Sequence, residues 1–311
     1  MSRSTRRGTG MALAVLVEDA CMQASSTSPN GNQGRALDRA GQKYTILDMA
    51  LTVRGAGHTL ILMSMYNGMV PKTGFLRRHR DPAYCCWLVQ SGHAQIQFGA
   101  HSQRAEPGQW LFVPAWLLRD QDFAPSTRLL SLRLGCSRDD GLPPYRRQRP
   151  LVLDDDQIPD FAPLLQALLQ AGGAQASGLG AMAQLAQVAA AWQELLCRQG
   201  WQSWENPVDD HLSRFIELLA QLSTPQLPWP QLEAASGRSR RQWDRCFLAA
   251  TGLSTHAWLQ RRFALRAAEC LSDHQRSIAA IAESFGFSDG SAFARWYRRQ
   301  SGLSPRQERQ R

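Results

Sequence analysis

Arginine side chains occupy matched places in two segments near the end of the 311-residue sequence. Residues 245–254 (RCFLAATGLS) recur 50 positions later as residues 295–304 (RWYRRQSGLS), with arginine, aromatic, glycine, leucine and serine positions in register. An internal repeat indicates two copies of one structural unit. A guanidinium group offers a planar fork of donors that fits a phosphate or the O6 and N7 atoms of guanine. If these arginines face outward, the repeat could therefore bind nucleic acid.

The second copy of the repeat predicts two helices joined by a tight turn. The first helix would bury an apolar face made of Ile278, Ile281, Ala282 and Phe285. Gly286 suits the turn, because a positive φ is cheap only for glycine, and Ser288 or Asp289 would cap the next helix. This second helix would end at Gly302 and would bury three aromatic residues, Phe293, Trp296 and Tyr297.

The first copy predicts the same arrangement. Leu232 and Ala235 would supply the inner face of its first helix, and Gly237 would lie in the turn. The second helix would begin at Ser239, end at Gly252 and bury two aromatic residues, Trp243 and Phe247. Residues 255–272 would join the copies through a helix with an apolar stripe, formed by Trp258, Leu259, Phe263, Ala267 and Leu271.

Residues 208–311 resemble the DNA-binding domain of the AraC/XylS family of transcriptional regulators. The motif that carries the resemblance is Ile281-Ala-x3-Gly286-Phe287-x5-Phe293-x-Arg295-x-Tyr297-x4-Gly302-x-Ser304-Pro305. The resemblance implies an all-α domain in which a long helix holds two helix-turn-helix units against successive major-groove segments. The chain departs from the family pattern at Glu308, where an aromatic residue is usual, and at Phe263, where arginine is usual. Gly290 and Ala294 also stand where longer base-reading side chains are common.

The same resemblance makes the outward side chains of both units candidate DNA contacts. Arg241, Asp244 and Arg245 would face bases in the first unit, and Asp244 could instead orient a neighbouring arginine. Ser291 and Arg295 would read bases in the second unit. For each arginine the alternative is a solvated surface side chain. The complete set of candidate contacts is Ser239, Arg240, Arg241, Asp244, Arg245, Ser291, Arg295, Arg298 and Arg299.

Residues 43–150 have the pattern of an all-β domain. Short apolar runs predict strands at 46–53, 59–66, 84–90, 94–98, 110–114 and 128–134, with glycine and proline between them. The stretch 106–114 (EPGQWLFVP) is similar to the turn and strand of a cupin-like barrel, the effector-domain fold common in the same family. The expected fold class is therefore α+β with two domains, and residues 1–42, rich in small polar residues, would form a flexible amino-terminal arm.

We expect the β domain to bind a small-molecule effector and not to be an enzyme. Metal-dependent cupins bring His and carboxylate ligands to one ion, whereas residues 78–81 read RHRD and the usual His after Pro114 is missing. No metal or other cofactor is expected. The alternative is a metal-dependent cupin enzyme fused to a DNA-binding module. Candidate effector contacts, most of which could equally be core residues, are His79, Tyr84, Trp87, Trp110, Phe112 and Trp116.

Residues 151–207 predict a helical segment and a linker. Apolar residues between 161 and 169 follow helical period, and 201–207 would be the linker. A second helix has the seam spacing of a two-helix coiled coil, through Met182, Leu185, Ala189, Trp192 and Leu196. This helix could cap the barrel or form a homodimer.

The charge favours a polyanionic partner, and the cysteine pattern favours a cytoplasmic location. The net charge is +9 and the pI about 9.6. The seven cysteines form no CxxC pair, and no apolar run is long enough to cross a membrane. Double-stranded DNA is therefore the expected partner, and RNA polymerase would be a further one if the protein is an activator.

Overall fold

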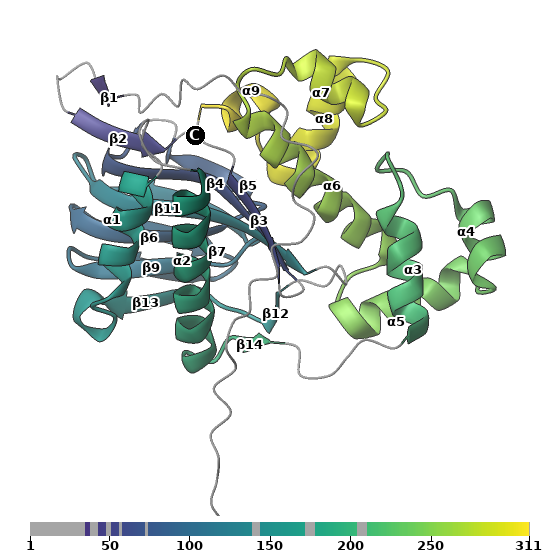
Figure 1. The fold of residues 1–311 in the computed structure, drawn as a ribbon, viewed down its shortest axis with the longest axis horizontal. Helices are drawn as coiled ribbons and strands as arrows, with labels where there is room; N and C mark the ends of the chain where they lie inside the picture. Colours follow the sequence, from purple (N-terminus) through teal and green to yellow (C-terminus); the bar gives the residue numbers. More distant parts are fainter. Residues whose placement is uncertain are drawn as a thin grey trace, which may run out of the picture.

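Two large antiparallel sheets and a short two-stranded one form the amino-terminal part of the chain, and helices form the carboxyl-terminal part (Figure 1). The computed structural model describes residues 35–37, 43–47, 51–55, 58–71, 74–138, 144–171, 178–203 and 210–310. The strands are β1 (Arg35–Leu37), β2 (Lys43–Leu47), β3 (Leu51–Gly55), β4 (His58–Met69), β5 (Leu76–Arg80), β6 (Tyr84–Ser91), β7 (Ala94–Phe98), β8 (His101–Ala105), β9 (Gln109–Val113), β10 (Leu118–Phe123), β11 (Arg128–Arg138), β12 (Tyr145–Arg147), β13 (Leu151–Asp154) and β14 (Gln202–Ser203).

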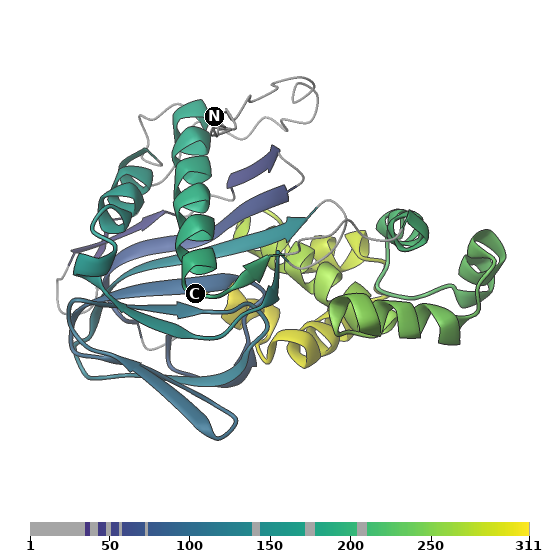
Figure 2. The same ribbon diagram turned by 90° about the horizontal axis from the view of Figure 1, so that it is seen from below.

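The larger sheet has the order β1-β2-β4-β11-β6-β9-β13, with β3 also paired to β4. The smaller sheet has the order β5-β10-β7-β8, and the two sheets pack face to face (Figure 2). Side chains of β6 alternate between the faces of the larger sheet, as strand geometry requires. Cys85, Trp87 and Val89 point between the sheets, whereas Cys86 and Leu88 point to the outer face. The space between the sheets is therefore filled by side chains.

The predicted β domain is present, but some of its strands differ from the prediction. The described strand pairings keep the two sheets separate and do not close a barrel. Pairing of β1 with β2 starts the sheet inside the segment expected to be an arm, and the rest of 1–42 lies outside the described residues. The predicted strand at 46–53 is divided between β2 and β3. Strands β5, β8 and β10 were missed because their sequences, LRRHR, HSQRA and LRDQDF, are mostly polar.

Helices α1 (Phe161–Ala171) and α2 (Gly178–Arg198) lie side by side over the outer face of the larger sheet (Figure 1). On α2 the predicted coiled-coil seam faces the sheet, because Leu185, Trp192 and Leu196 are each at most 2% exposed within this single chain. Their apolar surface already has a partner, so α2 acts as the cap of the sheet. Leu179 and Met182 are the large apolar side chains of α2 that stay exposed.

The predicted linker begins inside the core of the β domain. Trp201 is buried, and its Nε1 donates to the Arg149 carbonyl at 2.9 Å. Its ring packs edge-on against Tyr145, with centroids 5.0 Å apart. Residues 202–203 then form β14, while 204–209 lie outside the described residues. The predicted linker therefore starts at a buried ring, which completes an aromatic cluster.

The carboxyl-terminal helices are α3 (Asp210–Ala220), α4 (Trp229–Ser236), α5 (Arg240–Thr251), α6 (Thr255–Ser272), α7 (Ile278–Ser284), α8 (Gly290–Ser301) and α9 (Pro305–Glu308). Helix α6 runs from the group α3–α5 to the group α7–α9 (Figure 1). Its predicted apolar stripe is buried throughout. Of the helices in the described part of the chain, none is long and apolar enough to span a membrane.

A buried ion network joins the β domain to the end of the chain. Arg133 of β11 donates to both carboxylate oxygens of Asp81, at 3.0 and 3.1 Å, and to Glu308 Oε1 of α9 at 2.6 Å. Burial alone would lower the pKa of Arg133, but the two carboxylates outweigh it and hold that pKa well above its ordinary value. Glu308, which departs from the family pattern, is 6% exposed and thus has a definite partner across the domain boundary.

Candidate nucleic-acid interface

The first helix-turn-helix unit consists of α4, a turn and α5. Gly237 ends α4 with a φ of 67°, and Gly252 ends α5 with a φ of 72°, as predicted. Trp243 and Phe247 are buried. The Trp243 ring stacks on Phe215 of α3 with centroids 3.8 Å apart, which fixes α5 against the preceding helix.

The inner face of α4 differs from the prediction in one residue. Leu232 is buried, but Ala235 is exposed. Ser236, one turn after Leu232, lies on the inner face instead of Ala235. Its hydroxyl accepts a hydrogen bond from Trp243 Nε1 at 2.8 Å. Its hydroxyl also donates to the Leu232 carbonyl at 2.6 Å. A serine whose hydroxyl is satisfied in this way can serve on an inner face, which apolar periodicity alone could not reveal.

The second unit consists of α7, a turn at Gly286 and α8. Gly286 has a φ of 74°, and Gly302 ends α8 with a φ of 86°. Asp289, one of the two predicted caps, accepts from the Ala292 N–H at 2.7 Å. That bond, together with one from the Ser288 hydroxyl, lowers the pKa of Asp289. The three predicted aromatic residues of α8 are buried.

The end of each repeat contains a hydroxyl that the sequence analysis missed. Thr251 Oγ1 donates to the Phe247 carbonyl at 2.8 Å and accepts from the Leu253 N–H at 3.1 Å. Fifty residues later, Ser301 makes the equivalent bonds, to the Tyr297 carbonyl at 3.0 Å and from the Leu303 N–H at 3.2 Å. The matching hydroxyls at one offset were the available signal. Both copies of the repeat therefore share the hydrogen bonds that end their second helix, as well as the matched arginines.

Helix α6 holds the two units together through a buried polar contact. Gln260 is 6% exposed, and its Oε1 accepts from Trp296 Nε1 of α8 at 2.5 Å. Its Nε2 donates to the Pro225 carbonyl, in the loop before α4, at 2.6 Å. The side chain thus links both units to the connecting helix.

The candidate DNA contacts lie on the outward faces of α5 and α8. Eight of the nine are exposed: Ser239, Arg240, Arg241, Arg245, Ser291, Arg295, Arg298 and Arg299. The five candidates of the first unit line one surface groove along α5. Arginine donors on an exposed recognition helix can reach both phosphates and base edges.

Asp244 is the half-buried member of the set. Its Oδ1 accepts from the Thr255 N–H at the start of α6, at 3.0 Å, and its Oδ2 lies 3.7 Å from Arg240 Nε. The carboxylate therefore joins α5 to α6 and lies within reach of a neighbouring arginine. The second unit has Ala294 at the matched position, so this link belongs to the first unit alone.

The candidate effector contacts are distributed over three environments. Trp87 is buried between the sheets, and Trp110 and Phe112 are buried under α1 and α2. His79 is buried at 0% exposure. Tyr84 and Trp116 line a cavity between the β domain and the helices. Within the described residues, no three His, Cys, Asp or Glu side chains form a group that could hold a metal.

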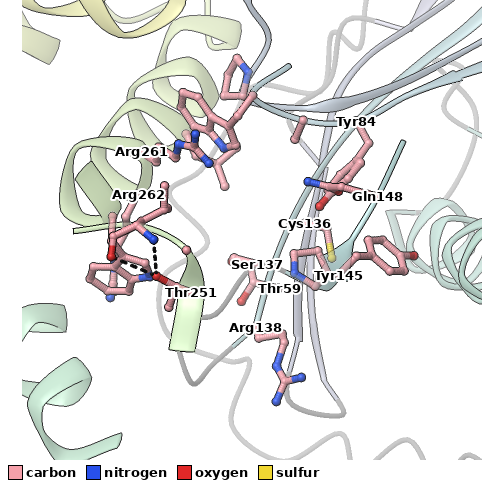
Figure 3. A pocket seen from close by; sticks show the side chains of 18 of the residues that line it. Thr59, Tyr84, Cys136, Ser137, Arg138, Tyr145, Gln148, Thr251, Arg261 and Arg262 are labelled. Atoms are coloured by element: carbon pink, nitrogen blue, oxygen red, sulfur yellow. Dashed lines mark hydrogen bonds between the residues drawn. The ribbon is translucent and has the colours of Figure 1, made fainter. Parts of the chain in front are cut away.

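This cavity has a volume of about 930 Å³ and two walls of different origin. Strand residues together with Pro144, Tyr145 and Gln148 form one wall, and the end of α5 together with α6 forms the other (Figure 3). Tyr84, Cys136 and Tyr145 lie on the strand side, and Arg261 and Arg262 lie on the helix side. Neither arginine was predicted from the sequence, because the apolar stripe of α6 says nothing of the polar residues beside it.

Burial perturbs the arginines of the helix wall. It lowers the pKa of Arg261, and the nearby positive charge of Arg80 lowers it further. It also lowers the pKa of Arg262, which has Arg266 as a cationic neighbour. Desolvation and like-charge repulsion both oppose the positive charge, so this wall would be stabilised by a bound anion.

Comparison with known proteins agrees with the geometry of the helices. A family model described as a helix-turn-helix domain matches residues 232–311. No curated protein sequence matches the chain. ToxT from Vibrio cholerae O395, bound to (E)-4-(8-methylnaphthalen-1-yl)but-3-enoic acid, aligns over 74% of this chain and 91% of that chain, with 11% identity and a TM-score of 0.51. Wild-type ToxT from Vibrio cholerae strain SCE256, bound to an unsaturated fatty acid, aligns over 74% of this chain and 87% of that chain, with 11% identity and a TM-score of 0.50.

The predicted glycine turns, caps and buried aromatic faces are present in both units, and the matched family model covers both. The β-rich domain and the helical domain together have the fold of ToxT. The chain therefore carries an AraC-type helix-turn-helix domain at its carboxyl terminus and is a DNA-binding transcriptional regulator.

Proposed function

We propose that the regulator reads one bipartite, directional DNA site through α5 and α8. Both recognition helices belong to one chain and are fixed to the same helix, so no second copy is needed to supply two half-sites. Arg241 and Arg245 would read bases in one half, and Ser291 and Arg295 in the other. Arg298 and Arg299, in the last turn of α8, would hold phosphates.

We further propose that a small molecule controls this binding from the cavity between the domains. The two ToxT structures named above each hold an organic acid. In this chain the space between the sheets is filled, whereas the cavity touches both the β domain and the end of α5. The effector would therefore act beside the first recognition helix, not in the mouth of a barrel. No catalytic step is part of this role, and a regulator of promoters would act in the cytoplasm.

The observation that carries the proposal is the pair of exposed arginine faces on two matched, capped helices. Duplexes selected from a random pool by the full chain would provide the site. We expect Arg245→Ala and Arg295→Ala each to weaken binding by about 1–3 kcal/mol, since each removes a bidentate donor. Binding would be measured by fluorescence anisotropy at fixed salt.

Arg214→Ala is the matched control, because Arg214 is an exposed arginine of α3 outside the candidate set. It should bind the selected duplex as the wild type does, apart from a small loss due to net charge. Wild-type affinity in both recognition-helix variants would contradict the proposal.

A further inference from the structure

The cavity between the domains carries an excess of positive charge. Of the described residues that line it, Arg138, Arg261, Arg262 and Arg266 are cationic, and Glu269 is the anionic one. Glu269 Oε1 already accepts from the Thr52 hydroxyl at 3.0 Å. The lining therefore has three more positive charges than negative ones, which favours an anionic occupant.

Two of these arginines are held by aromatic rings and not by carboxylates. The Arg261 guanidinium carbon lies 5.5 Å from the centroid of Trp116, and that of Arg262 lies 5.7 Å from the centroid of Trp258. No carboxylate among the described residues forms an ion pair with either. Partly buried charge that lacks a counter-ion is costly, and a ring face offsets only part of the cost. A ligand acid group would supply the missing counter-charge.

The rest of the lining fits an apolar body. Tyr84 and Tyr145 on the strand wall and Trp116 and Trp258 beside the arginines present aromatic surface. A volume of about 930 Å³ is within the range of sites for drug-sized ligands. We propose that the cavity binds an aromatic organic anion, whose acid group lies against Arg261 and Arg262 and whose rings lie among these aromatic side chains. This assignment rests on the proposed effector role of the cavity and specifies its ligand class.

The position of the cavity specifies which recognition helix such a ligand would influence. Residues 248–253, at the end of α5 and in the turn to α6, form part of the wall. The second unit is fastened to the β domain by the buried pair of Arg133 and Glu308. A ligand that bridges the two walls would therefore restrain the first unit, which contributes residues 248–253 to one of them.

A matched pair of fluorescent probes tests the ligand class with the full chain. The probe 8-anilino-1-naphthalenesulfonate carries an acid group, whereas N-phenyl-1-naphthylamine has the same ring system without it. We expect the double variant Arg261→Gln/Arg262→Gln to weaken binding of the sulfonate by about tenfold or more, since charge-assisted hydrogen bonds are lost. Binding of the neutral probe should change little. The single variants Arg261→Gln and Arg262→Gln should each weaken the sulfonate selectively by a smaller factor, and they provide a second test if the double variant does not fold.

Arg214→Gln controls for the loss of net charge and should leave both probes unchanged. Equal losses for the two probes, or unchanged sulfonate binding in the folded cavity variants, would overturn the anion assignment. Binding of the selected duplex without probe separates the two proposals. If the cavity variants and the wild type bind the duplex but the sulfonate shows no selectivity, only the ligand class fails. If the wild type binds no duplex specifically, the DNA-binding proposal fails, while the probe measurements still decide the ligand class.

Discussion

At the scale of single residues, Asp244 combines a place on the DNA-facing helix with a structural contact. Its carboxylate accepts from the N–H of Thr255, the first residue of α6, and lies 3.7 Å from Arg240. A negative charge at the start of a helix is favourable, so this bond supports the junction between α5 and α6. The structural contact competes with any role in base reading.

Replacing Asp244 should therefore affect stability more than replacing its neighbour. We expect Asp244→Ala to lower the free energy of unfolding by about 1–2 kcal/mol, because the Thr255 N–H loses its acceptor. Arg245→Ala removes an exposed side chain and should change stability by at most about 0.5 kcal/mol. Urea unfolding of both variants checks this, and equal losses would count against the structural role of Asp244.

Asp289 should make the stability of the folded protein depend on pH, and the direction of its pKa shift fixes the sign. Its folded-state pKa is lowered by the Ala292 N–H and the Ser288 hydroxyl, so its cap stabilises α8 above the unfolded-state pKa and loses that contribution as pH falls through the folded value. The stability difference between wild type and Asp289→Asn should therefore be greatest near neutral pH and shrink below about pH 4. Denaturant midpoints across this range provide the measurement, and a difference that grows on acidification would contradict the assignment.

The sequence predicted residues correctly where their role depends on the neighbouring backbone alone, as in turns and helix caps. Gly286 and Gly302 have positive φ, and Asp289 caps the next N–H groups, because such tasks depend on nearby backbone alone. It failed for Ser236, which works through a tryptophan seven residues away. It also failed for the cavity arginines, because Arg138 and Arg261 line one cavity only after two domains pack together.

At the scale of elements, apolar periodicity could find only strands that bury apolar side chains. The smaller sheet contains β5, β8 and β10, which are mostly polar, and Arg77 of β5 pairs with Asp122 of β10 at 2.5 Å. For α2 the spacing of the seam was correct, but spacing does not say whether a sheet or a second helix covers it. Packing within the chain decides that question.

The contact of α9 with β11 depends on Glu308, and its replacement should be costly. Glu308→Ala leaves the buried Arg133 without one of its two carboxylates, so we expect a loss of about 3–5 kcal/mol in the free energy of unfolding. The matched control is Glu194→Ala, whose exposed pair with Arg198 should contribute at most about 0.5 kcal/mol. Thermal or urea unfolding compares the two, and similar losses would show that the buried pair does not fasten α9.

At the scale of the whole molecule, the two recognition helices are attached to the β domain in different ways. The second unit is fixed by Glu308 and by close packing at Gly302, where an added Cβ would lie 2.8 Å from the Arg78 carbonyl oxygen. The first unit contributes residues 248–253 to the cavity wall.

Occupation of the cavity should therefore slow amide exchange at the end of α5 and the start of α6, with little change in α8. Hydrogen exchange with and without 8-anilino-1-naphthalenesulfonate tests this, and protection confined to α8 would contradict it.

The central claim is that α5 and α8 read separate halves of one directional site, and base-by-base substitution across a selected duplex tests it most directly. The measurement compares wild type, Arg245→Ala and Arg295→Ala at two salt concentrations. Arg245→Ala should flatten base preference in one half and Arg295→Ala in the other, with the halves about one helical turn, roughly 34 Å, apart. The half read by α5 should be the stricter one, because Gly290 and Ala294 offer no base-reading groups on α8, and the α8 half should depend more on salt. Loss of preference at the same positions in both variants, or a palindromic site, would contradict the account.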